Sequence, residues 1–141
     1  METCRGLGRT AGLTPRSRLT YALLVALTIP LGLVSRKFSF LLPPWLAKNA
    51  GDVLYATMAF WLVGFLFPRL STLHAALAAT LFCFGIEILK FSQAPWLVAA
   101  RHSRAGALVF GTGFHASNLL CYVIGVGVAV GVERALRRTR A

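Results

Sequence analysis

The sequence predicts an all-α membrane protein: a four-transmembrane-helix bundle with a short interfacial helix between the third and fourth spans. Two observations support this fold class. First, hydrophobic residues make up 57% and charged residues 13% of the 141 residues, more apolar surface than a soluble domain of this size can bury. Second, the apolar residues form continuous runs that are long enough to cross a bilayer, and the alternating pattern of a β-barrel is missing.

The positive charge lies mainly near the two ends of the chain. The net charge is +11, and basic residues next to apolar runs set membrane orientation and attract anionic lipid head groups. We therefore expect membrane lipids as partners and no nucleic acid, because the basic runs lack interleaved aromatic residues. The predicted regions are a disordered basic N-terminal tail over residues 1–17, a four-helix transmembrane domain over residues 18–136, and a basic C-terminal tail over residues 137–141.

The first span is predicted over the apolar run at residues 19–34. This run follows a basic segment, as in a signal peptide, but no small-residue cleavage site follows it, so we expect an uncleaved helix. Pro30 and Gly32 are expected to bend it. Residues 36–49 are then expected to be a loop. In that loop PPWLAKNA forms a short interfacial turn, because Pro43 and Pro44 stop a helix.

The remaining elements follow from proline positions and one capping residue. The second span is predicted over residues 51–67, where Pro68 ends it. Ser71 is a candidate N-cap for a third span that ends at residue 91 or 92. Pro95 begins the short interfacial helix, residues 105–114 form a turn or re-entrant segment, and the fourth span covers residues 116–136.

Four spans place both termini on the same side of the membrane. Of the 15 Lys and Arg residues, nine lie on the side of the termini and six on the other side. The positive-inside rule then predicts that both termini are cytoplasmic.

With this topology, several polar residues meet at the outer end of the bundle. Asp52 opens the second span, Glu87 lies near the outer end of the third, and Asn118 opens the fourth. A carboxylate inside a membrane span is costly and therefore suggests a function. Steps of three and four residues place Glu87 with Lys90, and Asn118 with Tyr122, on single helix faces. The candidate ligand-binding residues are Arg36, Asp52, Glu87, Lys90, Gln93, Arg101, Arg104, Asn118 and Tyr122.

Each of these residues also has a structural explanation. Asp52 can stabilise the N-terminus of the second span through the helix dipole. Glu87 and Lys90 can form an ion pair within one helix turn, and Arg36 can be an interface anchor. We expect no cofactor and no metal site, since the cysteines show no metal-binding spacing and His74 lies at the other end of the bundle from the other two histidines.

Three segments resemble a known family. GDVLYA at residues 51–56, FGIEILKFSQAPWLVAARHSRAGALVFGTGF at residues 84–114 and NLLCYVIG at residues 118–125 resemble the VanZ-like superfamily of small bacterial membrane proteins. Within it they are most similar to DUF2809, a family of unknown function. The chain departs from the family pattern at two places. Asn118 stands where an Asp is usual. The Gln that usually follows the Glu is either replaced by Lys90 or displaced to Gln93. The residues that match are Asp52, Glu87, Trp96, Arg101, Gly111, Gly113, Phe114, Tyr122 and Gly125.

The resemblance implies a bacterial inner (cytoplasmic) membrane protein with a role in the cell envelope, by analogy with the fold alone. We therefore expect a binding protein rather than an enzyme, whose outer polar cluster holds a lipid head group, an envelope precursor or a protein partner. Two alternatives stay open: a membrane enzyme acting on a lipid-linked phosphate with Glu87 as acid or base, and a small proton-coupled transporter. Four short spans leave little room for a transport pathway, so a transporter would be a homo-oligomer.

Overall fold

The computed structural model describes residues 16–110 and 114–140, and these residues form helices and no strands. Four of the helices, α1, α2, α3 and α6, are long and apolar enough to cross a membrane. This finding supports the predicted four-helix, multi-pass architecture. The elements in chain order are α1 (Arg18–Lys37), η1 (Ser39–Leu41), α2 (Pro44–Leu66), α3 (Thr72–Leu89), α4 (Pro95–His102), α5 (Arg104–Phe110) and α6 (Ala116–Arg140).

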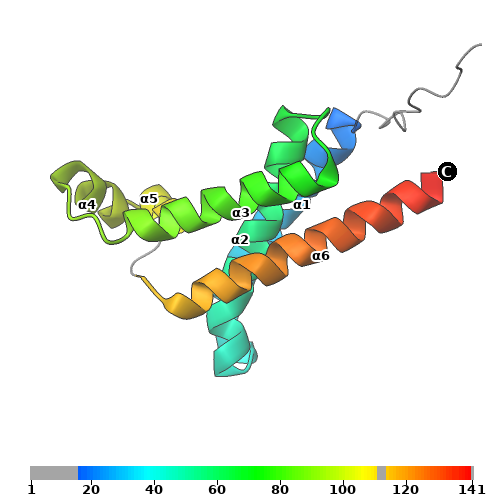
Figure 1. Ribbon diagram of the computed structural model, residues 1–141. Helices are drawn as coiled ribbons and strands as arrows, with labels where there is room; N and C mark the ends of the chain where they lie inside the picture. Colours follow the sequence, from blue (N-terminus) through cyan, green and yellow to red (C-terminus); the bar gives the residue numbers. More distant parts are fainter. Residues whose placement is uncertain (1–15, 111–113, 141) are drawn as a thin grey trace, which may run out of the picture.

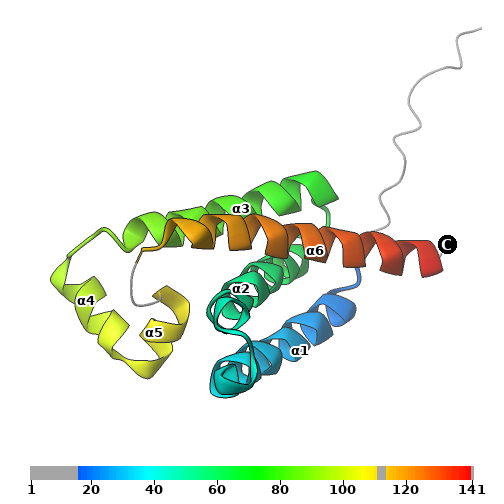
Figure 2. The same ribbon diagram turned by 90° about the horizontal axis from the view of Figure 1, so that it is seen from below.

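Helix α2 is the centre of the bundle. It packs along α1 and also contacts α3 and α6, while α3 and α6 lie side by side and run in opposite directions (Figures 1 and 2). The short helices α4 and α5 pack against each other beyond the C-terminal end of α3. This arrangement brings the end of α3 close to the start of α6.

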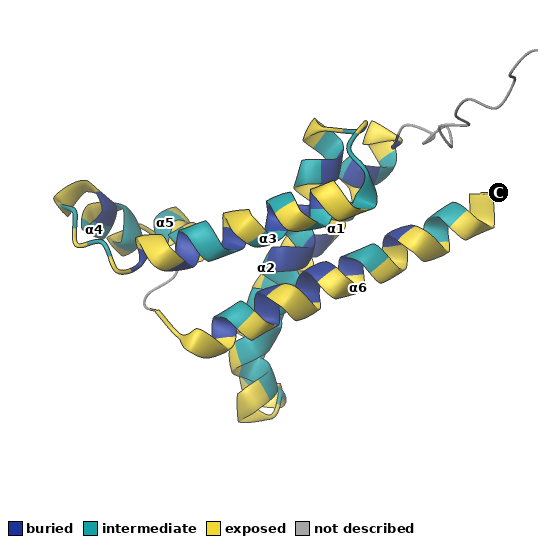
Figure 3. Ribbon diagram, in the orientation of Figure 1, coloured by how far each residue is buried: buried dark blue, intermediate teal, exposed yellow. Residues whose placement is uncertain are grey.

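Small side chains allow the helices to approach closely. Ala56, Ala75, Ala79 and Ala129 are fully buried where the helices meet, as is common in helix packing within membranes. Large apolar residues such as Leu81 point outward and are exposed, and Figure 3 shows this alternation of buried and exposed faces along each long helix. Outward leucines without a protein partner suit contact with lipid.

Helices α2 and α6 approach each other closely at Gly125. The Thr57 hydroxyl donates hydrogen bonds to the carbonyls of Val53 (2.9 Å) and Gly125 (3.0 Å). A Cβ at Gly125 would overlap the Val53 carbonyl oxygen and lie 2.9 Å from the Ala56 Cβ. Only glycine therefore permits this contact.

We expect Gly125→Ala to lower the free energy of unfolding by about 1–3 kcal/mol, because the added methyl group forces the two backbones apart. Gly127→Ala is the matched control on the same helix, since nothing lies within 4 Å of a Cβ there. Thermal unfolding in detergent, followed by circular dichroism, compares the two variants. Equal melting temperatures for both would contradict the close contact.

Helix α2 begins earlier than predicted. It starts at Pro44 rather than at residue 51, so PWLAKNA after the Pro43 N-cap forms its first two turns, and the predicted interfacial turn was wrong. Proline suits the first helical position because that position needs no backbone N–H donor. Asp52 consequently lies in the third turn, and the explanation that it stabilises the helix N-terminus was also wrong.

The other boundaries differ less. Ser71 caps α3 as predicted, since its hydroxyl accepts a hydrogen bond from the backbone N–H of His74 at 3.3 Å. Helix α3 ends at Leu89, before the predicted residue 91 or 92. Helix α5 occupies much of the segment predicted as a turn or re-entrant loop, and α6 continues past residue 136 to Arg140. The family-matching Gly111 and Gly113, and residues 1–15 of the predicted tail, lie outside the described residues.

Candidate functional site

Glu87 is the centre of a buried polar network at the end of α3. Its side chain is fully buried, and the Lys90 ammonium lies 2.5 Å from Oε2. Lys90 is the C-cap of α3, and its side chain turns back by one helix turn to reach the carboxylate. The ion pair predicted within one helix turn is therefore present.

Helix α6 supplies the other partners of the Glu87 carboxylate. The Tyr122 hydroxyl donates to Oε2 at 2.9 Å, and the Asn118 amide donates to Oε1 at 3.4 Å. The backbone N–H of His115, just before α6, donates to Oε1 at 3.0 Å. A buried carboxylate needs such donors to offset its lost hydration. The network thus joins α3 to the start of α6 and leaves Glu87 fully hydrogen-bonded.

Two polar atoms beside this network have no hydrogen-bond partner within residues 16–110 and 114–140. They are the buried Asn118 Oδ1 and the buried Arg101 Nε. The other end of the Arg101 guanidinium, Nη2, donates to the Leu89 carbonyl at 2.6 Å, which holds it next to the end of α3. Buried polar groups are rarely left unpaired. One donor next to the end of α3 and one acceptor on Asn118, which itself bonds to Glu87, therefore have no partner among these residues. A third such atom, Asn49 Oδ1, lies in α2.

The remaining predicted site residues lie at different distances from the network. Asp52 is half-buried and interacts electrostatically with Lys90, Arg36 and Glu87, so it lies near the network. The Arg36 side chain covers Gly51 on α2, with Nε 3.2 Å from the position a Cβ would take. Gln93 and Arg104 are exposed, and neither side chain bonds to the network in the described part of the chain. The structure therefore brings together Glu87, Lys90, Asn118 and Tyr122, with Arg101, Asp52 and Arg36 beside them.

A second buried carboxylate, Glu133, lies near the other end of α6, about 22 Å from Asn118 along the helix axis. Arg16 binds it through Nε at 2.6 Å and Nη2 at 3.3 Å, and the Tyr21 hydroxyl also donates to it. Arg137 lies one turn further along α6, and its Nη2 is 3.2 Å from Glu133 Oε1. This cluster was not predicted. The signal in the sequence was Glu133 itself, one of only four acidic residues and within the predicted fourth span.

Arg16 belongs to the segment predicted as a basic tail, yet its side chain is buried. Its Nη1 also donates to the Leu70 carbonyl at 2.5 Å, so it joins the start of α1, the α2–α3 turn and α6. Burial alone would lower the pKa of the Arg16 guanidinium, but the hydrogen bond and charge of Glu133 raise this pKa above its ordinary value. Arg16 is therefore a permanent cation that neutralises Glu133.

These features define a class: a small helical membrane protein that has one neutralised carboxylate network near each end of its bundle. The chain belongs to DUF2809, a family of proteins of unknown function, whose family model matches residues 41–126. The predicted resemblance to this family is thereby confirmed. The matched segment contains the whole Glu87 network, whereas Arg16, Tyr21 and Glu133 lie outside it. No solved structure matches the chain.

Proposed function

We propose that this protein binds the anionic head group of a membrane lipid or of a lipid-linked envelope precursor at the Glu87 end of the bundle. The observation that carries the proposal is the unpaired donor on Arg101 together with the unpaired acceptor on Asn118. A phosphate or carboxylate oxygen accepts from a guanidinium in a strong charge-assisted bond. A hydroxyl of the same head group would donate to Asn118 Oδ1.

Within this proposal Glu87 is a positioning residue. Its two oxygens already accept from Lys90, Tyr122, Asn118 and the His115 backbone, so the carboxylate has little capacity to take a proton from a substrate. Its bonds to Asn118 and Lys90 fix the neighbours that face the ligand. Saturation of the carboxylate supports binding rather than the enzymatic alternative.

The membrane orientation is part of the same proposal. We infer an inner-membrane protein with cytoplasmic termini, so that the Glu87 network lies near the outer face, where envelope precursors with phosphate head groups are handled. The excess of basic residues on the side of the termini supports this orientation. An exposed Trp96 (67% exposed) at the start of α4 suits the head-group region of the bilayer. We also propose that the protein is related to the VanZ-like superfamily.

The test is a comparison of Arg101→Gln with Arg104→Gln. Both remove one positive charge, but only Arg101 has a buried unpaired donor, whereas Arg104 is exposed. We expect Arg101→Gln to weaken binding of phosphatidylglycerol about tenfold, because a charge-assisted hydrogen bond is lost, and Arg104→Gln to change it less than about twofold. Native mass spectrometry of the purified protein titrated with phosphatidylglycerol counts the lipids bound to each variant, so a weakened Arg101 site appears as the loss of one bound lipid.

Circular dichroism and melting temperature establish that both variants are folded. Equal affinities in the two variants, or equal binding of phosphatidylcholine and phosphatidylglycerol by the unmodified protein, would refute a head-group site at Arg101.

A further inference from the structure

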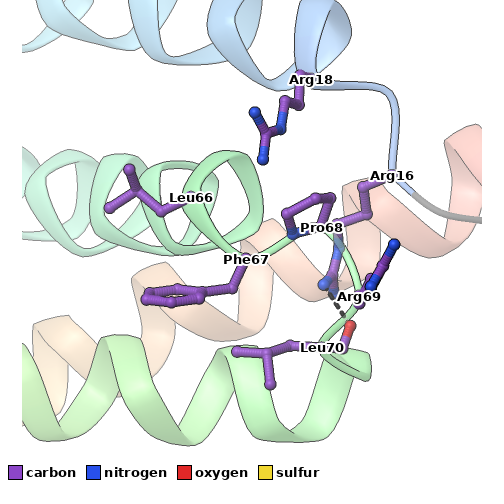
Figure 4. Close-up of a pocket in the computed structure, with 7 residues that line it drawn as sticks. All are labelled: Arg16, Arg18, Leu66, Phe67, Pro68, Arg69 and Leu70. Atoms are coloured by element: carbon purple, nitrogen blue, oxygen red, sulfur yellow. Dashed lines mark hydrogen bonds between the residues drawn. The ribbon is translucent and has the colours of Figure 1, made fainter.

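A cavity lies at the end of the bundle opposite the Glu87 network, where α1 begins and α2 turns into α3. Its volume is about 650 Å³, within the range of sites for small molecules. Figure 4 shows its lining: three arginines together with apolar residues and the proline of the α2–α3 turn. The lining residues are Arg16, Arg18, Leu66, Phe67, Pro68, Arg69 and Leu70.

The three arginines differ in their availability. Arg16 is fixed by Glu133 and by the Leu70 carbonyl, so it forms a rigid wall whose charge is already neutralised. Arg18 and Arg69 are exposed, and neither has an acidic partner among the residues that the structure describes. Figure 4 shows the Arg18 side chain extending from the start of α1 toward the C-terminal end of α2. The cavity therefore has at its edge two guanidinium groups that no carboxylate of residues 16–110 and 114–140 neutralises.

The apolar part of the cavity continues onto the outer surface of the helices. Leu66 is 54% and Phe67 is 57% exposed, next to Pro68. These residues end a helix long enough to cross a membrane, so they lie where the hydrocarbon region meets the head groups. A soluble anion would satisfy the arginines but leave this apolar surface without a partner.

We propose that this cavity binds one anionic phospholipid, with its phosphate at the edge that Arg18 and Arg69 line and the start of an acyl chain against Leu66 and Phe67. The paired positive charges select an anionic head group, and the adjoining apolar surface selects a lipid over a soluble phosphate. Arg16, held by Glu133, preforms the wall of the site. The site is separate from the Glu87 network and does not depend on the function proposed for it.

The experiment titrates the purified full chain with phosphatidylglycerol, and separately with phosphatidylcholine, in native mass spectrometry. Arg18→Gln/Arg69→Gln is the test variant. Arg134→Gln/Arg138→Gln is the matched control, because it removes two exposed arginines from the same end of the bundle but outside the cavity. Since each cation near the membrane surface contributes on the order of 1 kcal/mol, we expect the test variant to bind the cavity phosphatidylglycerol about tenfold or more weakly, which appears as the loss of one of two bound lipids. The control should stay within about twofold.

Equal loss of affinity in the control variant would overturn the proposal, because general attraction of lipid to basic residues would then suffice. Equal binding of phosphatidylcholine would also overturn it. Displacement of the phospholipid by millimolar glycerol 3-phosphate would identify a soluble-anion site instead. If the double variant does not fold, Arg18→Gln and Arg69→Gln are tested singly, each with an expected loss of about threefold. Arg101→Gln should remove one bound phosphatidylglycerol and keep the one in the cavity, whereas Arg18→Gln/Arg69→Gln should remove the cavity lipid and keep the one at Arg101, so the number of bound lipids in each mass spectrum separates the two sites.

Discussion

Replacing Glu87 by alanine should lower the free energy of unfolding by about 3–5 kcal/mol, because it leaves the Lys90 ammonium buried without its counter-charge. The same change removes the acceptor for Tyr122, Asn118 and the His115 backbone. Ile88→Ala, at the exposed neighbouring position (66% exposed), is the control and should cost far less. Thermal or denaturant unfolding in detergent micelles measures both.

A double substitution separates the ion pair from the wider network. Glu87→Leu/Lys90→Leu removes both charges and should restore part of the loss seen for Glu87→Ala, since a well-packed apolar pair can replace a buried ion pair. The hydrogen-bond donors on α6 would still lack an acceptor, so recovery should be incomplete. A double variant that is no more stable than Glu87→Ala would contradict the view that an unpaired buried Lys90 causes the loss.

Replacing Glu133 by alanine should have an effect of similar size, about 3–5 kcal/mol, because Arg16 would keep a buried charge without a partner. Arg16 also bonds the Leu70 carbonyl, so the start of α1 and the α2–α3 turn should loosen together. Hydrogen exchange of the backbone amides in these two segments reports that loosening directly.

Arg137→Ala is the matched control for Glu133→Ala. Arg137 contacts the same Glu133 oxygen at 3.2 Å, but its side chain is about one-third exposed, whereas that of Arg16 is fully buried. A partly exposed ion pair contributes at most about 1 kcal/mol. If Arg137→Ala were as destabilising as Glu133→Ala, Arg16 would not be the principal partner of Glu133.

The four long helices were predictable because their apolar runs and proline stops are local features. The start of α2 was misjudged because Pro44 was interpreted as a helix breaker, although it occupies the first helical position. Gly51 strengthened that error. In the structure Gly51 lies inside the helix, where the Arg36 side chain packs over it.

The Glu87 network was partly predictable for a similar reason. Helical spacing placed Glu87 with Lys90 and Asn118 with Tyr122. The antiparallel arrangement of the third and fourth spans then brought the two pairs to the same end of the bundle. The His115 contact was missed because its donor is a backbone N–H, which carries no side-chain signal. The bond between Arg16 and Glu133 joins residues 117 positions apart, and no local pattern indicates such a pair.

The most direct test of the proposed function is an experimental structure of the protein in nanodiscs that contain phosphatidylglycerol. We expect head-group density at the Glu87 end of the bundle, with an acceptor oxygen within hydrogen-bond distance of Arg101 Nε and a donor at Asn118 Oδ1. Density for water alone at both atoms, or a direct bond between Arg101 and Asn118, would contradict it.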